Sequence, residues 1–326
     1  YIFLDEVQRI EGWEKWVRMM NELGKARLVV SGSNAGLISE EYGTLLTGRH
    51  LGLQVYPLSF REFLSFNRVE CPAGEMPPTQ KIQVNGLFRR YMEYGAYPQV
   101  VLSEPKREIL LQYYEDILAR DLIRRYRIRK GPALKALVRH YLTNVASLAT
   151  FHSLEKHLGI TSDTIDKFSG YLEQAYLVYL LHRFSFKVKE QENSPRKVYA
   201  VDTGLANTVG FRFTENRGRL AENLVFLALK RRQVMQPDTE IYYWKDVQHH
   251  EVDFVIKRGQ EIESLLQVCW DLREDGTRKR ELRALEKARQ ELGVKEATVI
   301  TEEEGEIPDD EAHGIRVISL VRWLLE

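Results

Sequence analysis

The chain has 326 residues, of which 44% are hydrophobic and 29% charged, and its 47 Lys and Arg residues balance 47 Asp and Glu residues. This composition excludes a disordered tail, and the balanced charge excludes a global positive field for nucleic acid or membranes, so such binding requires a local patch. Cys71 and Cys269 are too far apart for a Cys-x-x-Cys zinc cluster or a disulfide framework, which predicts a reducing, cytoplasmic location. We find no leader peptide and no apolar run long enough to span a bilayer, so we expect no membrane partner.

The first zone, residues 1–103, begins with an apolar strand that ends in Asp5 and Glu6. An amphipathic stretch follows, and a second short apolar run covers residues 27–30. The stretch has its apolar residues at helical spacing, namely Trp13, Trp16, Val17, Met20 and Leu23. Strand, helix and strand in this order predict a parallel sheet. Ser59 lies three residues before Glu62, which predicts a capping box at a helix start.

Two carboxylates at the end of an apolar strand are suited to phosphate chemistry. Asp5 can hold a hydrated Mg²⁺, and Glu6 can polarise the water that attacks a phosphate. The second strand ends in small polar residues, where Ser33 or Asn34 could contact a γ-phosphate or position water, and Arg49 could stabilise transition-state charge. The alternatives are a solvated strand end and an ordinary salt bridge of Arg49.

The second zone, residues 104–190, is predicted to be almost entirely helical, with one buried helical face between Leu134 and Val145. A short helix then ends at Gly159 and another begins near Ser162, which is a helix-turn-helix layout. The second of these helices exposes a net acidic set of side chains, which argues against major-groove recognition. Apolar runs around a polar, Pro-containing tip predict a two-stranded wing over residues 180–201.

A dense basic segment precedes the helix-turn-helix. Its cations, opposed by the single acid Asp121, are Arg120, Arg124, Arg125, Arg127, Arg129, Lys130, Lys135 and Arg139. Such a patch could bind phosphates, so DNA is a predicted partner whose affinity would fall with salt, and Tyr126 could stack on a base. Alternatively, some of the arginines pair with acids of another domain or subunit. Further candidates for DNA contact are the wing residues Lys187, Lys189, Arg196 and Lys197.

The third zone, residues 191–326, alternates strands with helices. Glu222 lies on a helical stretch and Asp253 in the strand-like EVDFVIK. This is the order of a PD-(D/E)xK nuclease, in which acids bind a divalent metal and a lysine on the next strand orients water. The next strand should supply acid-x-lysine, but it reads Gln267, Val268, Cys269.

A glutamine lacks the negative charge that helps to hold a hard cation, and a cysteine cannot replace an ammonium. Lys245 or Lys257 could be a migrated substitute for the lysine. The zone is therefore predicted to be a nuclease-like scaffold that retains a degenerate metal site of Glu222 and Asp253 and is used for binding. His249 and His250 are interpreted as loop residues rather than metal ligands.

The motifs of the three zones, taken in order, resemble those of a known family. They are LDEVQ, VVSGSNAGLIS, LLTGRHLGLQVYPLSFREF, EYGAYPQVV, EDILARDLIRRYRIRK, VDTGLAN, AEN and EVDF. They look like the AAA+-like ATPases of archaea and bacteria that carry a Walker B strand, a sensor strand, a Gly-Arg motif and a C-terminal domain of uncharacterised function. The resemblance covers nearly the whole chain. It implies Mg²⁺ coordination by Asp5, water activation by Glu6, a sensor role for Ser33 or Asn34, and a trans-acting or sensing role for Arg49.

The family also needs a phosphate-binding loop, and no G-x-x-x-x-G-K-[ST] motif occurs in this sequence. In the family this loop precedes the Walker B strand, so we expect it upstream of Tyr1. ATP and Mg²⁺ are accordingly expected as cofactors of the complete chain, and this fragment alone is not expected to bind ATP. Family members work as rings or smaller assemblies, which makes a homo-oligomer a candidate partner.

The predicted fold class is α/β, with a partial AAA+-type parallel-sheet domain (1–103), a helical winged-helix segment (104–190) and an α/β restriction-endonuclease-like domain (191–326). Three functions are compatible with it. The first is an AAA+-like ATPase coupled to an inactive nuclease-like domain and associated with DNA. The second is a non-catalytic DNA-binding or assembly protein in which the ATPase part is structural. The third is a metal-dependent nuclease.

Overall fold

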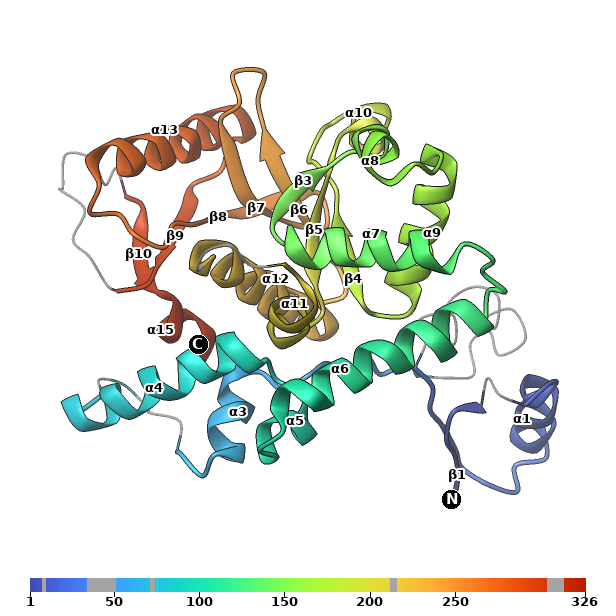
Figure 1. Ribbon diagram of the computed structural model, residues 1–326. Helices are drawn as coiled ribbons and strands as arrows, with labels where there is room; N and C mark the ends of the chain where they lie inside the picture. The colour runs from blue at the N-terminus through green and yellow to red at the C-terminus, as the bar shows by residue number, and fades with distance from the viewer. Residues whose placement is uncertain (8–9, 34–50, 71–73, 75, 212–215, 304–313) are drawn as a thin grey trace.

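The computed structural model describes residues 1–7, 10–33, 51–70, 74, 76–211, 216–303 and 314–326. Within them, three separate sheets form, with two, three and five strands. Figure 1 shows the N-terminal strand and helix at one end of the molecule, and the five-stranded sheet with its covering helices at the other. Among the described residues, no helix combines the length and the apolar character needed to cross a membrane.

The first sheet has the predicted parallel arrangement. Strands β1 (Ile2–Leu4) and β2 (Leu28–Val30) pair in parallel, and α1 (Trp13–Glu22) connects them. Trp13 and Val17 of α1 are buried against Val7, which makes a small core of its own. The carboxyl ends of β1 and β2 therefore lie side by side.

A series of helices follows. They are α3 (Phe60–Phe66), α4 (Pro78–Tyr94), α5 (Pro98–Leu102) and α6 (Lys106–Asp116), and α6 continues into the π-helical segment η3 (Ile117–Arg124). The predicted capping box at α3 is confirmed, since the Ser59 hydroxyl accepts from the Glu62 N–H and the Glu62 carboxylate accepts from the Ser59 N–H. In Figure 1, α4 and α6 run along one side of the molecule.

The three-stranded sheet carries the helix-turn-helix. Its elements in chain order are α7 (Gly131–Thr143), β3 (Ser147–Ala149), α8 (Phe151–Leu158), α9 (Ser162–Gln174), β4 (Val178–Leu181), α10 (Val188–Asn193) and β5 (Arg196–Ala200). The predicted helix end at Gly159 and start at Ser162 are confirmed, and Gly159 has the left-handed conformation with φ 64°. Strand β5 pairs antiparallel with both β3 and β4, so the boundary predicted at residue 190 falls inside this sheet.

The five-stranded sheet lies between two helices. Its strands are β6 (Thr239–Lys245), β7 (Glu251–Arg258), β8 (Glu261–Val268), β9 (Glu296–Thr301) and β10 (Arg316–Ser319), in the order β10-β9-β8-β7-β6. Successive residues of β8 face opposite ways: Leu265 packs in the core that α13 (Asp275–Leu292) covers, whereas Leu266 packs in the core of α12 (Arg217–Met235). Helix α12 is therefore buried between this sheet and the rest of the molecule, and α15 (Leu320–Leu325) packs against its end.

The motifs EYGAYPQVV and VDTGLAN meet in the folded chain. Asp202 caps α11 (Thr203–Val209) by accepting from the Leu205 N–H, and its other oxygen accepts from the Ala96 N–H at 2.7 Å. Gly95 has φ 74°, and a Cβ there would lie 2.0 Å from the Asp202 carboxylate. This close approach requires glycine and joins α4 to α11.

Candidate functional site

The two strand-end acids of β1 face the residues that follow β2. The Ser31 hydroxyl donates to Asp5 Oδ1 and accepts from the Glu6 N–H at 3.4 Å, and the Ser33 hydroxyl is 3.4 Å from Glu6 Oε2. Asp5 is exposed and Glu6 half-buried, with Glu6 at φ 52°. The parallel pairing of the strands thus brings the predicted Asp5, Glu6 and Ser33 together.

Two other predicted residues of this site, Asn34 and Arg49, lie outside the described residues. Ser31 was not among the predicted residues, although it makes the hydrogen bonds to both Asp5 and Glu6. Its position one residue after β2 was the available signal, because parallel strands end at the same sheet edge.

The basic segment begins beside this site. Arg120 lies on η3 and pairs with Asp121 at 3.1 Å. The hydrogen bond and charge of Asp121 raise the pKa of Arg120, and the charge of Glu6 adds to that effect. Glu6 is therefore within electrostatic reach of the first arginine of the segment, and Figure 1 shows the N-terminal strand and helix near this end of the long α6 helix.

The other cations of the segment face solvent. Four of them, Arg124, Arg127, Arg129 and Lys130, are exposed, and Arg125 is half-buried. No acidic side chain in the described part of the chain forms a salt bridge with any of these five. Lys135 of the same segment does pair with Glu115, at 3.1 Å. Pairing of the five other cations with acids of another subunit stays a prediction.

Tyr126 is already engaged within the protein. Its ring stacks on Tyr171 with centroids 3.7 Å apart, and its hydroxyl donates to Gln174 at 2.6 Å. The Arg125 guanidinium lies 5.8 Å from the ring centroid. One face of the ring is therefore covered, which leaves it poorly placed for the predicted base stacking.

A buried ionic cluster lies where β5, α12 and β7 meet. The Lys197 ammonium is 2.8 Å from Glu222 Oε1, 2.8 Å from Glu251 Oε1 and 2.7 Å from Asp253 Oδ1. Lys197 is only 2% exposed. The Tyr199 hydroxyl also donates to Glu222 Oε1 at 2.7 Å. The structure thus brings Glu222 and Asp253 together, as the sequence predicted, with a lysine between them.

The charged groups of the cluster shift one another's pKa values. Burial alone would lower the pKa of Lys197, but the carboxylates of Asp253, Glu222 and Glu251 hold that pKa well above its usual value. Burial and the nearby charge of Asp253 raise the pKa of Glu222, whereas the ammonium of Lys197 and the hydroxyl of Tyr199 oppose that rise. Burial also opposes ionisation of Glu251, but Lys197 and Lys245 outweigh it and lower the pKa of Glu251.

The prediction that Lys197 contacts DNA from a wing is wrong, because this side chain is buried among the acids. Lys257 does not replace the missing lysine either: its ammonium pairs with Glu240, at the far end of β7 from Asp253. Lys245 does reach the cluster, 2.9 Å from Glu251 Oε2. A signal for Lys197 was its place in the apolar strand RKVYAV, where an unpaired lysine would be costly.

The residues at the position predicted to supply acid-x-lysine surround the cluster with neutral groups. The Gln267 side chain accepts from the Asp253 N–H at 3.2 Å and donates to Glu281 at 2.7 Å. The Val268 N–H donates to Asp253 Oδ2 at 2.8 Å. Burial raises the pKa of the Cys269 thiol to about 12, so it is uncharged at neutral pH. Asp253 therefore has partners on both oxygens and on its own N–H.

A cavity of about 460 Å³ opens onto the cluster. Its lining includes Lys197, Glu222 and Asp253 together with Arg219 and Arg280. His249 and His250 also lie there, on the loop between β6 and β7 as predicted; His249 is exposed, and His250 lies 2.8 Å from Asp246.

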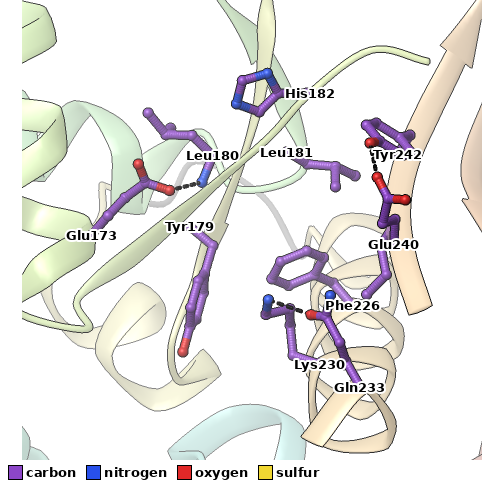
Figure 2. A pocket seen from close by; sticks show the side chains of 11 residues that line it. Glu173, Tyr179, Leu180, Leu181, His182, Phe226, Lys230, Gln233, Glu240 and Tyr242 are labelled. Atoms are coloured by element: carbon purple, nitrogen blue, oxygen red, sulfur yellow. Dashed lines mark hydrogen bonds between the residues drawn. The ribbon is translucent and has the colours of Figure 1, made fainter. Parts of the chain in front are cut away.

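A second, smaller cavity of about 260 Å³ lies between the three-stranded sheet and the C-terminal sheet (Figure 2). Glu173 accepts from the Leu180 N–H at 2.8 Å, and the Lys230 ammonium donates to Gln233 at 2.6 Å. Burial raises the pKa of Glu173 and lowers that of Lys230, and the charge of each partly opposes the other's shift. The cavity thus lies where α9, β4, α12 and β6 meet, and its lining includes polar side chains from these elements.

Comparison with known proteins finds a family model for each of three parts of the chain. A family model described as an AAA domain matches residues 1–64. Two domains of unknown function, DUF8612 and DUF4143, match residues 85–216 and 217–323. The N-terminal part, which carries the strand-end acids Asp5 and Glu6, is thus similar to AAA domains. The matched models carry no winged-helix or nuclease description, so those two assignments stay predictions.

Two curated relatives cover nearly all of the chain. It is 33% identical to the uncharacterized protein MJ1544 of Methanocaldococcus jannaschii, over 99% of this chain and 74% of the relative. It is 30% identical to an uncharacterized protein of Haemophilus influenzae, over 100% of this chain and 78% of the relative. The chain belongs to the same protein family as these two relatives. No solved structure matches it.

Proposed function

We propose that the whole protein is an ATPase and that its AAA domain hydrolyses the nucleotide. The observation that carries this proposal is the placement of Asp5 and Glu6 at the carboxyl end of β1, in contact with Ser31 and Ser33 beyond β2. Open edges of parallel sheets at strand carboxyl ends are common nucleotide sites. The match of residues 1–64 to an AAA domain supports the same activity.

Asp5 is proposed to hold Mg²⁺ through its exposed carboxylate, whose oxygens are the ligand type that this ion prefers. Mg²⁺, when bound, would neutralise charge on the phosphates. Glu6 is proposed to orient and polarise the attacking water, and Ser33 or Asn34 to sense the γ-phosphate. Arg49 is proposed to stabilise transition-state charge; if it acts in trans, the active form is a homo-oligomer.

Phosphate binding needs a further part. The 326-residue sequence contains no G-x-x-x-x-G-K-[ST] motif, so the proposal concerns the whole protein together with a phosphate-binding loop. We place this activity in the cytoplasm, in line with the two isolated cysteines.

ATP turnover by the full-length protein tests the proposal. Glu6→Gln should lower kcat by roughly 100-fold or more while ATP still binds, because only the general base is lost. Glu14→Gln, which removes an acid from the first turn of α1, is the matched control and should leave turnover unchanged. Unchanged turnover in Glu6→Gln would refute the role of Glu6.

A second candidate function is DNA binding through the basic segment. It is favoured by the five cations, Arg124, Arg125, Arg127, Arg129 and Lys130, that have no salt-bridge partner among the described residues. Arg120 lies within electrostatic reach of Glu6, which would place bound DNA beside the ATPase site. The order α7, β3, α8, α9, β4, α10, β5 and the antiparallel pairing of β5 with β3 and β4 support a winged-helix-like module here, with the short helix α10 at the tip of the wing.

Binding of a labelled duplex at two salt concentrations tests this candidate. Each phosphate contact removed should reduce the slope of log affinity against log salt by about one. Arg124→Ala with Arg127→Ala should therefore weaken binding at low salt, whereas Lys187→Ala with Lys189→Ala tests the wing separately. Full binding by the first double variant would exclude the basic segment as the DNA site.

A further inference from the structure

We propose that Lys197 is a built-in cation that takes the place of a divalent metal in the acid cluster of Glu222, Glu251 and Asp253. The same ammonium joins the segment of residues 85–216, which contains β5, to the segment of residues 217–323, which supplies the acids. The inference concerns the C-terminal half and is independent of the ATPase proposal.

The contacts of Lys197 carry this inference. A lysine ammonium has three N–H donors, and three different carboxylates lie within 2.8 Å of Lys197 Nζ. One ammonium is therefore surrounded by three acids of the cluster, and it donates a hydrogen bond to Asp253. A metal bound by Glu222 and Asp253 would need the same oxygens and would meet the positive charge of Lys197 at close range. In the described residues, no group of three or more His, Cys, Asp and Glu side chains is arranged to hold a metal ion.

The burial of the partners makes the arrangement obligatory. Asp253 is 5% exposed and Glu222 is 8% exposed, so neither can be left without a counter-charge at little cost. Their cation comes from β5, whereas the acids come from α12 and β7. Removing one member of a buried ionic group leaves the others uncompensated, which strongly destabilises a protein.

The glutamine at the third nuclease position fits a cluster with an internal cation. Gln267 lies between Asp253 and Glu281: it accepts from the Asp253 N–H and donates to the Glu281 carboxylate, without adding charge. An acid at this position would place another negative charge beside Asp253, whose cation is already shared with Glu222 and Glu251. The neutral residue is thus the one that the cluster can accommodate.

The neighbouring contacts join the same two segments. Asn223, the residue after Glu222, accepts from the Ala200 N–H at 2.8 Å and donates to the Ala200 carbonyl at 3.0 Å. Ala200 lies on β5, three residues after Lys197. The cluster and this amide pair therefore fix β5 against α12 at two consecutive residues of the helix.

Thermal unfolding of the full-length protein tests the ionic joint. Lys197→Met keeps the length of the side chain and removes its charge, so the midpoint should fall by roughly 10 °C. Lys257→Met removes the same charge from the partly exposed pair with Glu240 and should shift the midpoint little. Adding Glu222→Gln and Asp253→Asn to Lys197→Met should restore part of the loss. An equal, small shift in Lys197→Met and Lys257→Met would overturn the inference.

Calorimetric titration with Mn²⁺, without nucleotide, tests the replacement of the metal. The parent protein should show no Mn²⁺ binding that depends on Asp253, so parent and Asp253→Asn should titrate alike. Lys197→Ala should gain one Mn²⁺ site, lost again when Asp253→Asn is added, because three carboxylates then face the vacated space. Binding to the parent that Asp253→Asn abolishes would overturn the inference, and that comparison holds even if the Lys197 variants do not fold.

Discussion

The Lys197 ammonium lies 2.7 Å from the Asp253 carboxylate, although 56 residues separate the two along the chain. Lys197 belongs to the three-stranded sheet and Asp253 to the five-stranded sheet. Their contact therefore requires that the two sheets are packed against each other. The presence of this contact therefore indicates that the middle and C-terminal parts of the chain are packed together.

Tyr199→Phe should weaken this region without changing any charge. The variant removes the hydroxyl that donates to Glu222 at 2.7 Å and keeps the ring stacked on Phe226, whose centroid is 4.1 Å away. We expect a loss of about 2 kcal/mol in the free energy of unfolding, because the lost hydrogen bond is to an ionisable, buried partner. Urea denaturation measures it. A double-mutant cycle with Glu222→Gln should show coupling, and additive effects would contradict the assignment.

Gly95→Ala should be strongly destabilising. Gly95 has φ 74° and ψ −158°, a region that is essentially restricted to glycine, and the added Cβ would overlap the Asp202 carboxylate. We expect a loss of at least about 3 kcal/mol, measured by denaturant unfolding. Gly86→Ala is the matched control within α4: no heavy atom lies within 4 Å of its added Cβ, so it should stabilise by about 0.5–1 kcal/mol. Similar effects of the two substitutions would be inconsistent with the packing described.

Asp202 should make stability depend on pH. Burial raises its pKa from 3.8 to about 6 in the folded protein. The folded-state pKa lies above the unfolded value, so the protonated carboxyl of Asp202 stabilises the folded state. This stabilisation is fully present below about pH 4 and is lost as pH rises through about 6. The loss should approach about 3 kcal/mol. Asp202→Asn keeps an oxygen for the backbone N–H group of Ala96 or Leu205, and it should remove this pH-dependent part of the free energy of unfolding. An unchanged pH profile in the variant would argue against it.

Ser31→Ala should affect Mg²⁺ use by the ATPase. The Ser31 hydroxyl donates to the proposed ligand Asp5 and accepts from the Glu6 N–H. Loss of a hydrogen bond that orients a metal ligand should raise the Mg²⁺ concentration for half-maximal turnover by roughly 10-fold. Ser65→Ala is a suitable control, because the Ser65 hydroxyl on α3 donates to the Arg61 carbonyl of the same helix. Equal Mg²⁺ dependence in the two variants would rule out this role of Ser31.

Local features of the fold were predictable because their signals are local. The Ser59–Glu62 capping box, the helix end at Gly159 and the helical start at Ser162 each depend on a few adjacent residues. The parallel pairing of β1 with β2 followed from the strand, helix, strand order, since such a connection favours parallel strands. The positions of Glu222 on a helix and Asp253 on a strand followed in the same way.

Contacts between distant segments were not predictable in this way. A lysine directly before the apolar run VYAV indicates a buried cation, but nothing in the sequence states that its partners lie on α12 and β7. Lys257 was a reasonable substitute for the missing lysine because it lies on the same strand as Asp253. The two residues lie toward opposite ends of β7, however, and Lys257 pairs with Glu240 instead. The stacking of Tyr126 on Tyr171 depends on how η3 packs against α9, which periodicity does not fix.

The ionic and amide contacts across residues 216 and 217 also limit how this family can change over time. A recombination event that transplanted either matched segment into another protein would carry away Lys197 without its acids, or the acids without Lys197. The orphaned charges would be buried, so such a chimera would fold poorly and be removed by selection. We therefore expect residues 85–216 and 217–323 to be inherited together, whichever domain lies on their N-terminal side.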